Sequence, residues 1–131
     1  MKTGTSPRRL IVGVGNAGIA VLDGLSSAHP GIRDLLAVNN DRDSLTASVV
    51  PDRIEIPEGD PREGFLAIEE KFAEFIGGSA TVLLCGGLGG ETGTFFLPSL
   101  AALSKAAGIT TVAVVGMPFT FEGKQRREAA G

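Results

Sequence analysis

The chain has 131 residues, of which 43% are hydrophobic and 21% charged, and its formal net charge is −3. This balance excludes an intrinsically disordered chain, and the length suits one domain that buries about two-thirds of its unfolded surface. Lys and Arg do not gather into the basic stripe of a nucleic-acid-binding protein, so no nucleic-acid partner is expected. The single cysteine, Cys85, excludes a disulfide framework and is compatible with a reducing compartment.

The run from Leu10 to Leu25 is loosely like a signal peptide, but Asn16, Asp23 and several glycines interrupt it. The sequence contains no stretch of 18 or more uninterrupted apolar residues, so no transmembrane helix is predicted and no membrane insertion is expected. We expect a cytoplasmic protein.

The predicted elements alternate along the chain. Residues 1–9 are polar and expected to be flexible, and residues 10–131 are expected to form one domain. Apolar or alternating runs predict strands at Leu10–Val14, Leu35–Asn39, Arg53–Ile56, Thr81–Cys85 and Thr110–Val115. Helical patterns predict helices from about Ile19 to His29, from Arg62 to Ile76 and from Leu97 to Ala107, with a further helix beginning at Lys124. Pro98 is tolerable only in the first turn of its helix.

This order predicts an α/β fold, a three-layer Rossmann-like parallel sheet with helices on both faces. Ligands of such sheets bind beyond the carboxyl ends of the strands, where the strand order reverses.

Two glycine-rich segments follow predicted strands. The first is Gly13-Val14-Gly15-Asn16-Ala17-Gly18, and the second runs from Gly86 to Thr94 with five glycines and two threonines. Backbone N–H groups in such loops, ahead of a helix N-terminus that supplies about half a positive charge, suit phosphate oxygens. The alternatives are a tight strand–helix turn for the first segment and a mobile linker for the second.

The first segment also fits the dinucleotide motif G-x-G-x-x-G, with Asp41 as the acidic residue after the next strand. An NAD-binding Rossmann module of an oxidoreductase is therefore an alternative. Two loops suit a triphosphate better than a dinucleotide, and no lysine follows either loop as in a Walker motif. His29 is interpreted as a surface residue and Cys85 as a small core residue. No cluster of residues has metal-ligand spacing, so any Mg²⁺ would bind with the nucleotide.

Four elements in order resemble the nucleotide-binding domain of the tubulin/FtsZ superfamily, and bacterial FtsZ in particular. They are Gly13–Gly18, Asn39-Asn40-Asp41, the Gly89–Thr94 signature loop and Pro118-Phe119-Thr120-Phe121-Glu122-Gly123. The run from Gly108 to Val115 is also similar to that family. The resemblance covers about residues 8–128.

The resemblance implies a domain of a cytoskeletal GTPase of cell division that binds GTP or GDP with nucleotide-bound Mg²⁺. The phosphates of the nucleotide would lie between the two glycine loops, and Glu122 and Arg126 would contact its ribose. The implied site comprises Gly15, Asn16, Ala17, Gly18, Ile19, Asn39, Asp41, Gly89, Gly90, Glu91, Thr92, Gly93, Thr94, Glu122 and Arg126.

The chain departs from the family pattern at several of these positions. Glu91 and Phe95 replace glycines, and Asn40 replaces a threonine. A carboxylate at position 91 would repel phosphates unless it points away or meets Mg²⁺. A degenerate, non-catalytic filament-interaction domain is therefore a second alternative.

In this family, hydrolysis is completed in trans by a loop of the neighbouring subunit that follows a long central helix. This sequence ends before that helix, as expected of a fragment or a divergent short relative. We expect it to hydrolyse GTP poorly alone, and to self-associate or bind a full-length filament protein.

Overall fold

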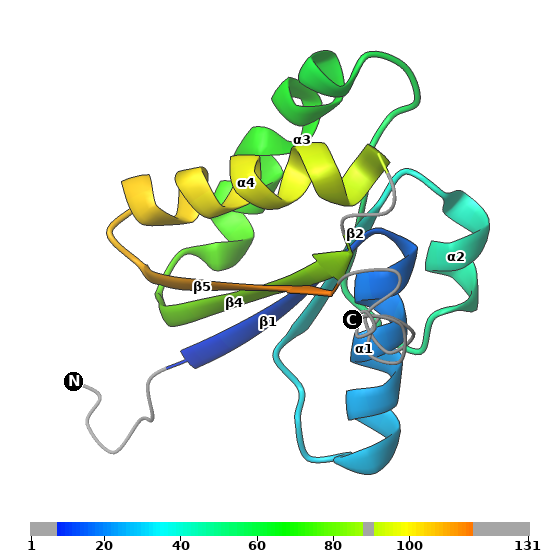
Figure 1. Ribbon diagram of the computed structural model, residues 1–131. Helices are drawn as coiled ribbons and strands as arrows, with labels where there is room; N and C mark the ends of the chain where they lie inside the picture. Colours follow the sequence, from blue (N-terminus) through cyan, green and yellow to red (C-terminus); the bar gives the residue numbers. More distant parts are fainter. Residues whose placement is uncertain (1–7, 88–90, 117–131) are drawn as a thin grey trace, which may run out of the picture.

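The computed structural model describes residues 8–87 and 91–116. Its elements alternate between strand and helix along the whole described chain (Figure 1). They are β1 (Arg8–Val14), α1 (Gly15–Ala28), β2 (Leu35–Asn39), α2 (Arg42–Ala47), β3 (Arg53–Glu55), α3 (Pro61–Ile76), β4 (Ser79–Gly87), α4 (Glu91–Ala106) and β5 (Thr110–Gly116).

The strands form one five-stranded sheet in the order β3-β2-β1-β4-β5, and every neighbouring pair is parallel. The chain runs outward from β1 to β3, then returns to place β4 on the other side of β1. The strand order therefore reverses between β1 and β4, which is where ligands bind in open α/β sheets. The predicted α/β fold with a parallel sheet is confirmed.

Helices cover both faces of the sheet, with α3 and α4 on one side and α1 and α2 on the other (Figure 1). The alternation of side chains along β1 explains the two cores. Leu10, Val12 and Val14 lie in the larger core beneath α3 and α4, whereas Ile11 packs against the smaller core that contains Ile19 and Leu22 of α1.

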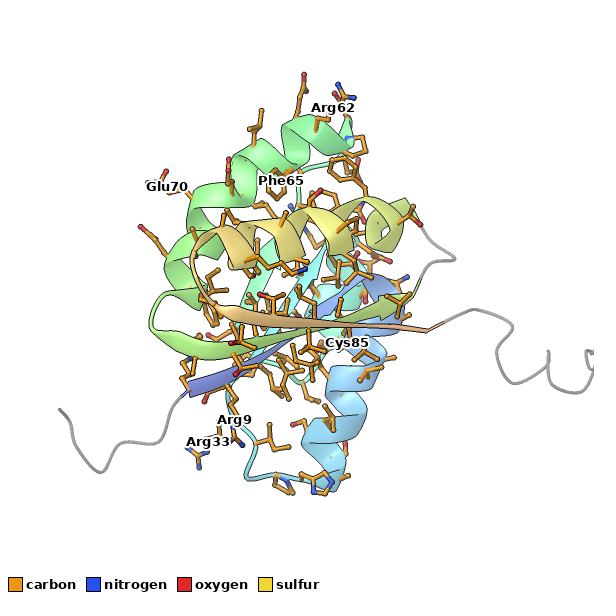
Figure 2. The ribbon with its side chains drawn as sticks, turned by 60° about the vertical axis from the view of Figure 1, so that its left-hand side comes forward. Arg9, Arg33, Arg62, Phe65, Glu70 and Cys85 are labelled. Carbon is orange, nitrogen blue, oxygen red and sulfur yellow. The ribbon has the colours of Figure 1, made fainter. Side chains whose placement is uncertain are left out.

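Helix α3 forms where the sequence predicts it. Asp60 caps its N-terminus by accepting a hydrogen bond from Arg62 N, and Pro61 occupies the first turn, where a missing N–H has no consequence. Its buried stripe consists of Gly64, Ile68, Phe72 and Ile76. In Figure 2, Arg62 and Glu70 lie on its outer side while Phe65 faces α4.

Several elements differ from the prediction: α1 begins at Gly15, four residues early, and β4 extends two residues further at each end, from Ser79 to Gly87. Strand β1 begins at Arg8, two residues early, because Arg8 and Arg9 pair with Ser79 and Thr81 of β4. The Arg8 guanidinium also donates to the carbonyl of Phe75 at 2.9 Å. The short helix α2 was not predicted; its cap is Asp41, whose carboxylate accepts from Ser44 N.

Helix α4 begins at Glu91, six residues earlier than predicted, so Pro98 lies inside it and not in its first turn. The predicted glycine-rich loop extends to Thr94, whereas residues 91–94 form the first turn of α4, where Gly93 packs against Gly87. Pro98 is exposed, so its ring lies on the outer side of the helix, and Ser99 Oγ donates to the carbonyl of Phe95 at 2.9 Å.

Strand β5 is less covered than a central parallel strand would be. Val112 and Val114 are 47% and 52% exposed, on the face of the sheet that α1 shields only near β1 and β4. Coverage of both faces therefore holds for the centre of the sheet and not for β5. The predicted helix from Lys124 lies outside the described residues.

Candidate functional site

A cavity of about 720 Å³ lies at the carboxyl edge of the sheet, beside the point where the strand order reverses. Its volume is within the range of small-molecule sites, about 300–1,000 Å³. The lining residues come from the ends of β1, β2, β4 and β5, from the two residues after β2, from the first two turns of α1 and from the first turn of α4. They are Val14, Gly15, Asn16, Ala17, Val21, Asn39, Asn40, Asp41, Cys85, Gly86, Gly87, Thr92, Gly93, Val114 and Gly116.

The two glycine-rich segments meet at this cavity. Gly15, which has a φ of +77°, begins α1, and a Cβ placed on it would lie 3.8 Å from both Gly93 N and Thr92 Cβ. The segments converge because β1 and β4 are adjacent and parallel, so both strand–helix connections leave the same edge. A positive φ is a conformation that favours glycine.

Several glycines of these segments have a packing role as well. A Cβ on Gly18 would lie 2.5 Å from the carbonyl oxygen of Cys85, and one on Gly13 would lie 2.5 Å from the carbonyl oxygen of Gly18. A Cβ on Gly93 would collide with the carbonyl oxygen of Gly87. These glycines let α1 and α4 lie directly against β1 and β4, so the tight-turn interpretation describes part of their role.

The N-terminus of α1 has no side-chain cap. Its N-cap is Val14, and its first turn contains no acidic residue. The first N–H groups of a helix have no partner within the helix and concentrate positive potential. Gly15, Asn16 and Ala17 of this turn line the cavity together with Thr92 and Gly93 from the first turn of α4. The arrangement can bind an anion with backbone donors from two helices.

A chain of hydrogen bonds runs along the polar side of the cavity. Thr92 Oγ1 donates to Asn40 Oδ1 at 3.1 Å, and Asn40 N donates to Asn39 Oδ1 at 2.8 Å. Asn39 Nδ2 in turn donates to Asn16 Oδ1 at 2.6 Å. Asn39 is 1% exposed, so its amide is buried and uses both its oxygen and its nitrogen. The chain connects the start of α4, the end of β2 and the start of α1.

The charges at the cavity are few. Among its described lining residues, none is Lys or Arg, and Asp41 is the one carboxylate. Asp41 Oδ1 accepts from Ser44 N at 3.3 Å, so this carboxylate is held at the rim. A polyanion here would be neutralised by helix N-termini and by a metal ion bound with it.

Cys85 lines the cavity and lies on the side of β4 that faces α1 (Figure 2). Burial raises the pKa of its thiol from 9.0 to about 11, and Sγ lies 3.5 Å from the carbonyl oxygen of Val12. The thiol is therefore neutral at physiological pH and unsuited to nucleophilic chemistry. It is a core residue, as predicted, and His29 is exposed, as predicted.

The structure brings together seven of the predicted site residues, which line the cavity: Gly15, Asn16, Ala17, Asn39, Asp41, Thr92 and Gly93. Gly18 and Ile19 are buried behind it, and Thr94 is exposed on α4. Glu91 begins α4, whereas Gly89, Gly90, Glu122 and Arg126 lie outside the described residues.

Eight lining residues were not in the predicted site: Val14, Val21, Asn40, Cys85, Gly86, Gly87, Val114 and Gly116. Four of these, Val14, Asn40, Gly86 and Gly87, lie within the motifs from which the site was predicted. Most of the eight belong to strand ends or follow one directly, which is the signal that could have found them.

Neither a metal cluster nor a membrane span is found in the described part of the chain. Within residues 8–87 and 91–116, no group of three His, Cys, Asp or Glu side chains could hold a metal ion. Among the helices described, none combines the length and apolar character needed to cross a bilayer.

No model of a protein family matches the chain. Individual proteins do match it. It is 34% identical over 136 residues to "Cell division protein FtsZ 2" of Rhizobium meliloti, covering 95% of this chain and 39% of that protein. It is also 34% identical to "Cell division protein FtsZ" of Coxiella burnetii, covering 96% of this chain and 36% of that protein.

Solved structures agree with these matches. The structure titled "FtsZ dimer, empty (M. jannaschii)" superimposes with a TM-score of 0.77 at 33% identity, covering 96% of this chain and 40% of that one. The CetZ structure from Methanosaeta thermophila has a TM-score of 0.75 at 24% identity and shows the shared fold alone. The chain thus spans between 28% and 41% of the length of relatives and solved structures such as these. Over that span it is similar to FtsZ proteins in both sequence and fold, which identifies a tubulin/FtsZ-like domain.

Proposed function

We propose that this chain is a GTP- and GDP-binding domain of an FtsZ-like cytoskeletal protein of cell division. One observation supports it most: the uncapped first turn of α1 and the first turn of α4 line one cavity, and a Cβ placed on Gly15 would lie 3.8 Å from Gly93 N. Two helix N-termini that converge in this way provide backbone donors and positive potential for a chain of phosphates.

The residues present fit a nucleotide of this kind. Asn16 and Ala17 are exposed at the start of α1 and would lie along the α- and β-phosphates, while Thr92 and Gly93 would contact the β- and γ-phosphates. Asn39 and Asp41 would lie near the phosphates and the ribose. The proposed site also includes Gly89, Gly90, Glu91, Thr94, Glu122 and Arg126. Gly18 and Ile19 are buried in α1 and belong to the proposed site only as support for its first turn.

Mg²⁺ fits the site as an ion bound with the phosphates. Asp41 supplies a carboxylate at the rim, and the described lining offers no cationic side chain to neutralise the phosphates. Mg²⁺ prefers oxygen ligands and keeps several waters, so a single carboxylate near the phosphates suffices to orient it. When bound, it would withdraw charge from the phosphate oxygens.

The protein residues would act by position and electrostatics. Backbone N–H groups from two rigid helices would be arranged before the ligand arrives, so they need no reorganisation. In the proposal, a neighbouring subunit completes hydrolysis in trans, and the chain self-associates or binds a longer FtsZ-like filament protein in the cytoplasm. The M. jannaschii relative is described as a dimer.

Binding is tested by calorimetry with GDP, GTP, ATP and NADH, each in the presence of Mg²⁺. We expect heat of binding with the guanine nucleotides and a weaker response with ATP and NADH. Tighter binding of NADH would support the dinucleotide alternative. Absence of binding to all four at millimolar concentration would contradict the proposal and favour a non-catalytic interaction domain.

A pair of charge variants in α1 tests the location of the site. Ala17→Glu places a carboxylate at the first turn, where it stabilises the helix by about 0.3–1 kcal/mol but repels phosphate. Ser27→Glu adds the same charge at the other end of α1, away from the cavity, as the control. We expect at least about tenfold weaker GDP binding in the first variant only. Equal affinities in the two variants would place the site elsewhere.

A further inference from the structure

Asn40 connects two parts of the cavity that are far apart in sequence. Its side-chain oxygen accepts a hydrogen bond from Thr92 Oγ1 at 3.1 Å, across 52 residues of chain. Asn40 follows β2 and Thr92 lies in the first turn of α4, and both line the cavity. Their hydrogen bond therefore spans the polar side of the candidate site.

The acceptor of this bond is held on a rigid support. Asn40 N donates to the buried side chain of Asn39 at 2.8 Å, and Asn39 is anchored to Asn16 at the start of α1. The donor is the hydroxyl of Thr92 on α4, which can rotate about its Cβ–Oγ1 bond. A hydroxyl carries one hydrogen, so it donates to one acceptor at a time.

A phosphate oxygen at the start of α4 would compete with Asn40 for that hydrogen. We propose that Asn40 is a positioning residue which holds the first turn of α4 in the absence of ligand and lowers phosphate affinity by occupying the Thr92 hydroxyl. The proposal rests on the proposed function, since it requires a phosphate at this cavity. Ligand binding would exchange a hydrogen bond to a neutral amide for a stronger one to an anion.

The sign of the effect separates competition from simple structural support. If Asn40 only supported the site, removing its side chain would weaken binding. If it competes, Asn40→Ala should bind GDP more tightly, by about two- to tenfold, the size of one net hydrogen bond between neutral groups. The gain must depend on the hydroxyl of Thr92.

The experiment is a double-mutant cycle on GDP affinity, measured by calorimetry at fixed Mg²⁺ and salt with Asn40→Ala, Thr92→Val and the double variant. We expect the gain from Asn40→Ala to vanish in the Thr92→Val background. Thr46→Ala, an exposed threonine of α2 that does not line the cavity, is the control and should leave affinity unchanged.

Hydrogen exchange without nucleotide gives a second readout. Amides in the first turn of α4 should exchange faster in Asn40→Ala than in the wild type, and Thr46→Ala should not change them. If the wild type binds GDP but Asn40→Ala binds it equally or more weakly, this inference is overturned and the proposed function stands. If the wild type binds no guanine nucleotide, both fall together. Unchanged exchange in α4 would refute the positioning role.

Discussion

Gly18 and Gly24 lie in the same helix, α1, and the structure predicts opposite effects for the same substitution. A Cβ on Gly18 would lie 2.5 Å from the carbonyl oxygen of Cys85 and 2.8 Å from the carbonyl carbon of Gly13. Both neighbours are backbone atoms of central strands and cannot rotate away. A Cβ on Gly24 would have no atom within 4 Å.

The magnitudes follow from two opposing contributions. Overpacking costs about 1–3 kcal/mol, and we expect the upper part of this range at Gly18 because α1 as a whole would have to move. Replacing glycine by alanine within a helix returns about 0.5–1 kcal/mol. Gly18→Ala should therefore destabilise the fold by about 2 kcal/mol, whereas Gly24→Ala should stabilise it by about 0.5–1 kcal/mol.

Urea denaturation followed by far-ultraviolet circular dichroism measures both effects, since the chain has no Trp or Tyr for fluorescence. With a urea m-value of about 1–3 kcal/mol/M, the Gly18→Ala midpoint should fall by about 1 M and the Gly24→Ala midpoint should rise slightly. Equal midpoints for the two variants would refute the packing role assigned to Gly18. The change in stability at Gly18 shows whether this glycine of the first motif is needed for packing of α1 against the sheet, independently of any ligand.

Two further predictions concern the free energy of unfolding and not ligand binding. Burial raises the pKa of Cys85 to about 11, so the thiol ionises in the unfolded chain at a lower pH than in the folded protein. The free energy of unfolding should therefore fall as pH rises from about 9 to 11, by at most about 2–3 kcal/mol. Urea midpoints across this range should fall less in Cys85→Ala than in the wild type, and parallel profiles would contradict the assignment. Arg8 donates to the carbonyl of Phe75 and its guanidinium carbon lies 5.2 Å from the centre of the Phe75 ring. Arg8→Ala should therefore lower the free energy of unfolding by about 1–2 kcal/mol. Arg9 is exposed (Figure 2), so Arg9→Ala should change it by less than about 0.5 kcal/mol. Similar losses in the two variants would show that the contacts of Arg8 do not stabilise the fold.

Local sequence determined most of the elements. The apolar run Leu35–Asn39 was predicted to be a strand with the bounds that the structure has. The spacing of Ile68, Phe72 and Ile76 predicted the buried face of α3, because hydrophobic periodicity follows directly from helix geometry. The alternation of strands and helices was enough to predict a parallel sheet with helices on both faces.

The start of α4 could not be predicted in the same way. Glycine and threonine have low helix propensity, so residues 91–94 were assigned to a loop, yet Gly93 is helical and lies against Gly87. Contact with β4 overrides the local preference. The same reasoning placed Pro98 in the first turn of the helix, whereas it lies in the interior of α4. A proline is tolerated there because its ring is on the exposed side of the helix.

The sequence by itself determined that two glycine-rich segments follow strands and precede helices, because strand and helix patterns and glycine content are local properties. Only the tertiary structure decided that β1 and β4 are neighbours, so that Gly15 and Gly93 meet and Thr92 reaches Asn40 across 52 residues. Strand order depends on which buried faces pack together, and that is a property of the whole sheet and not of any one segment.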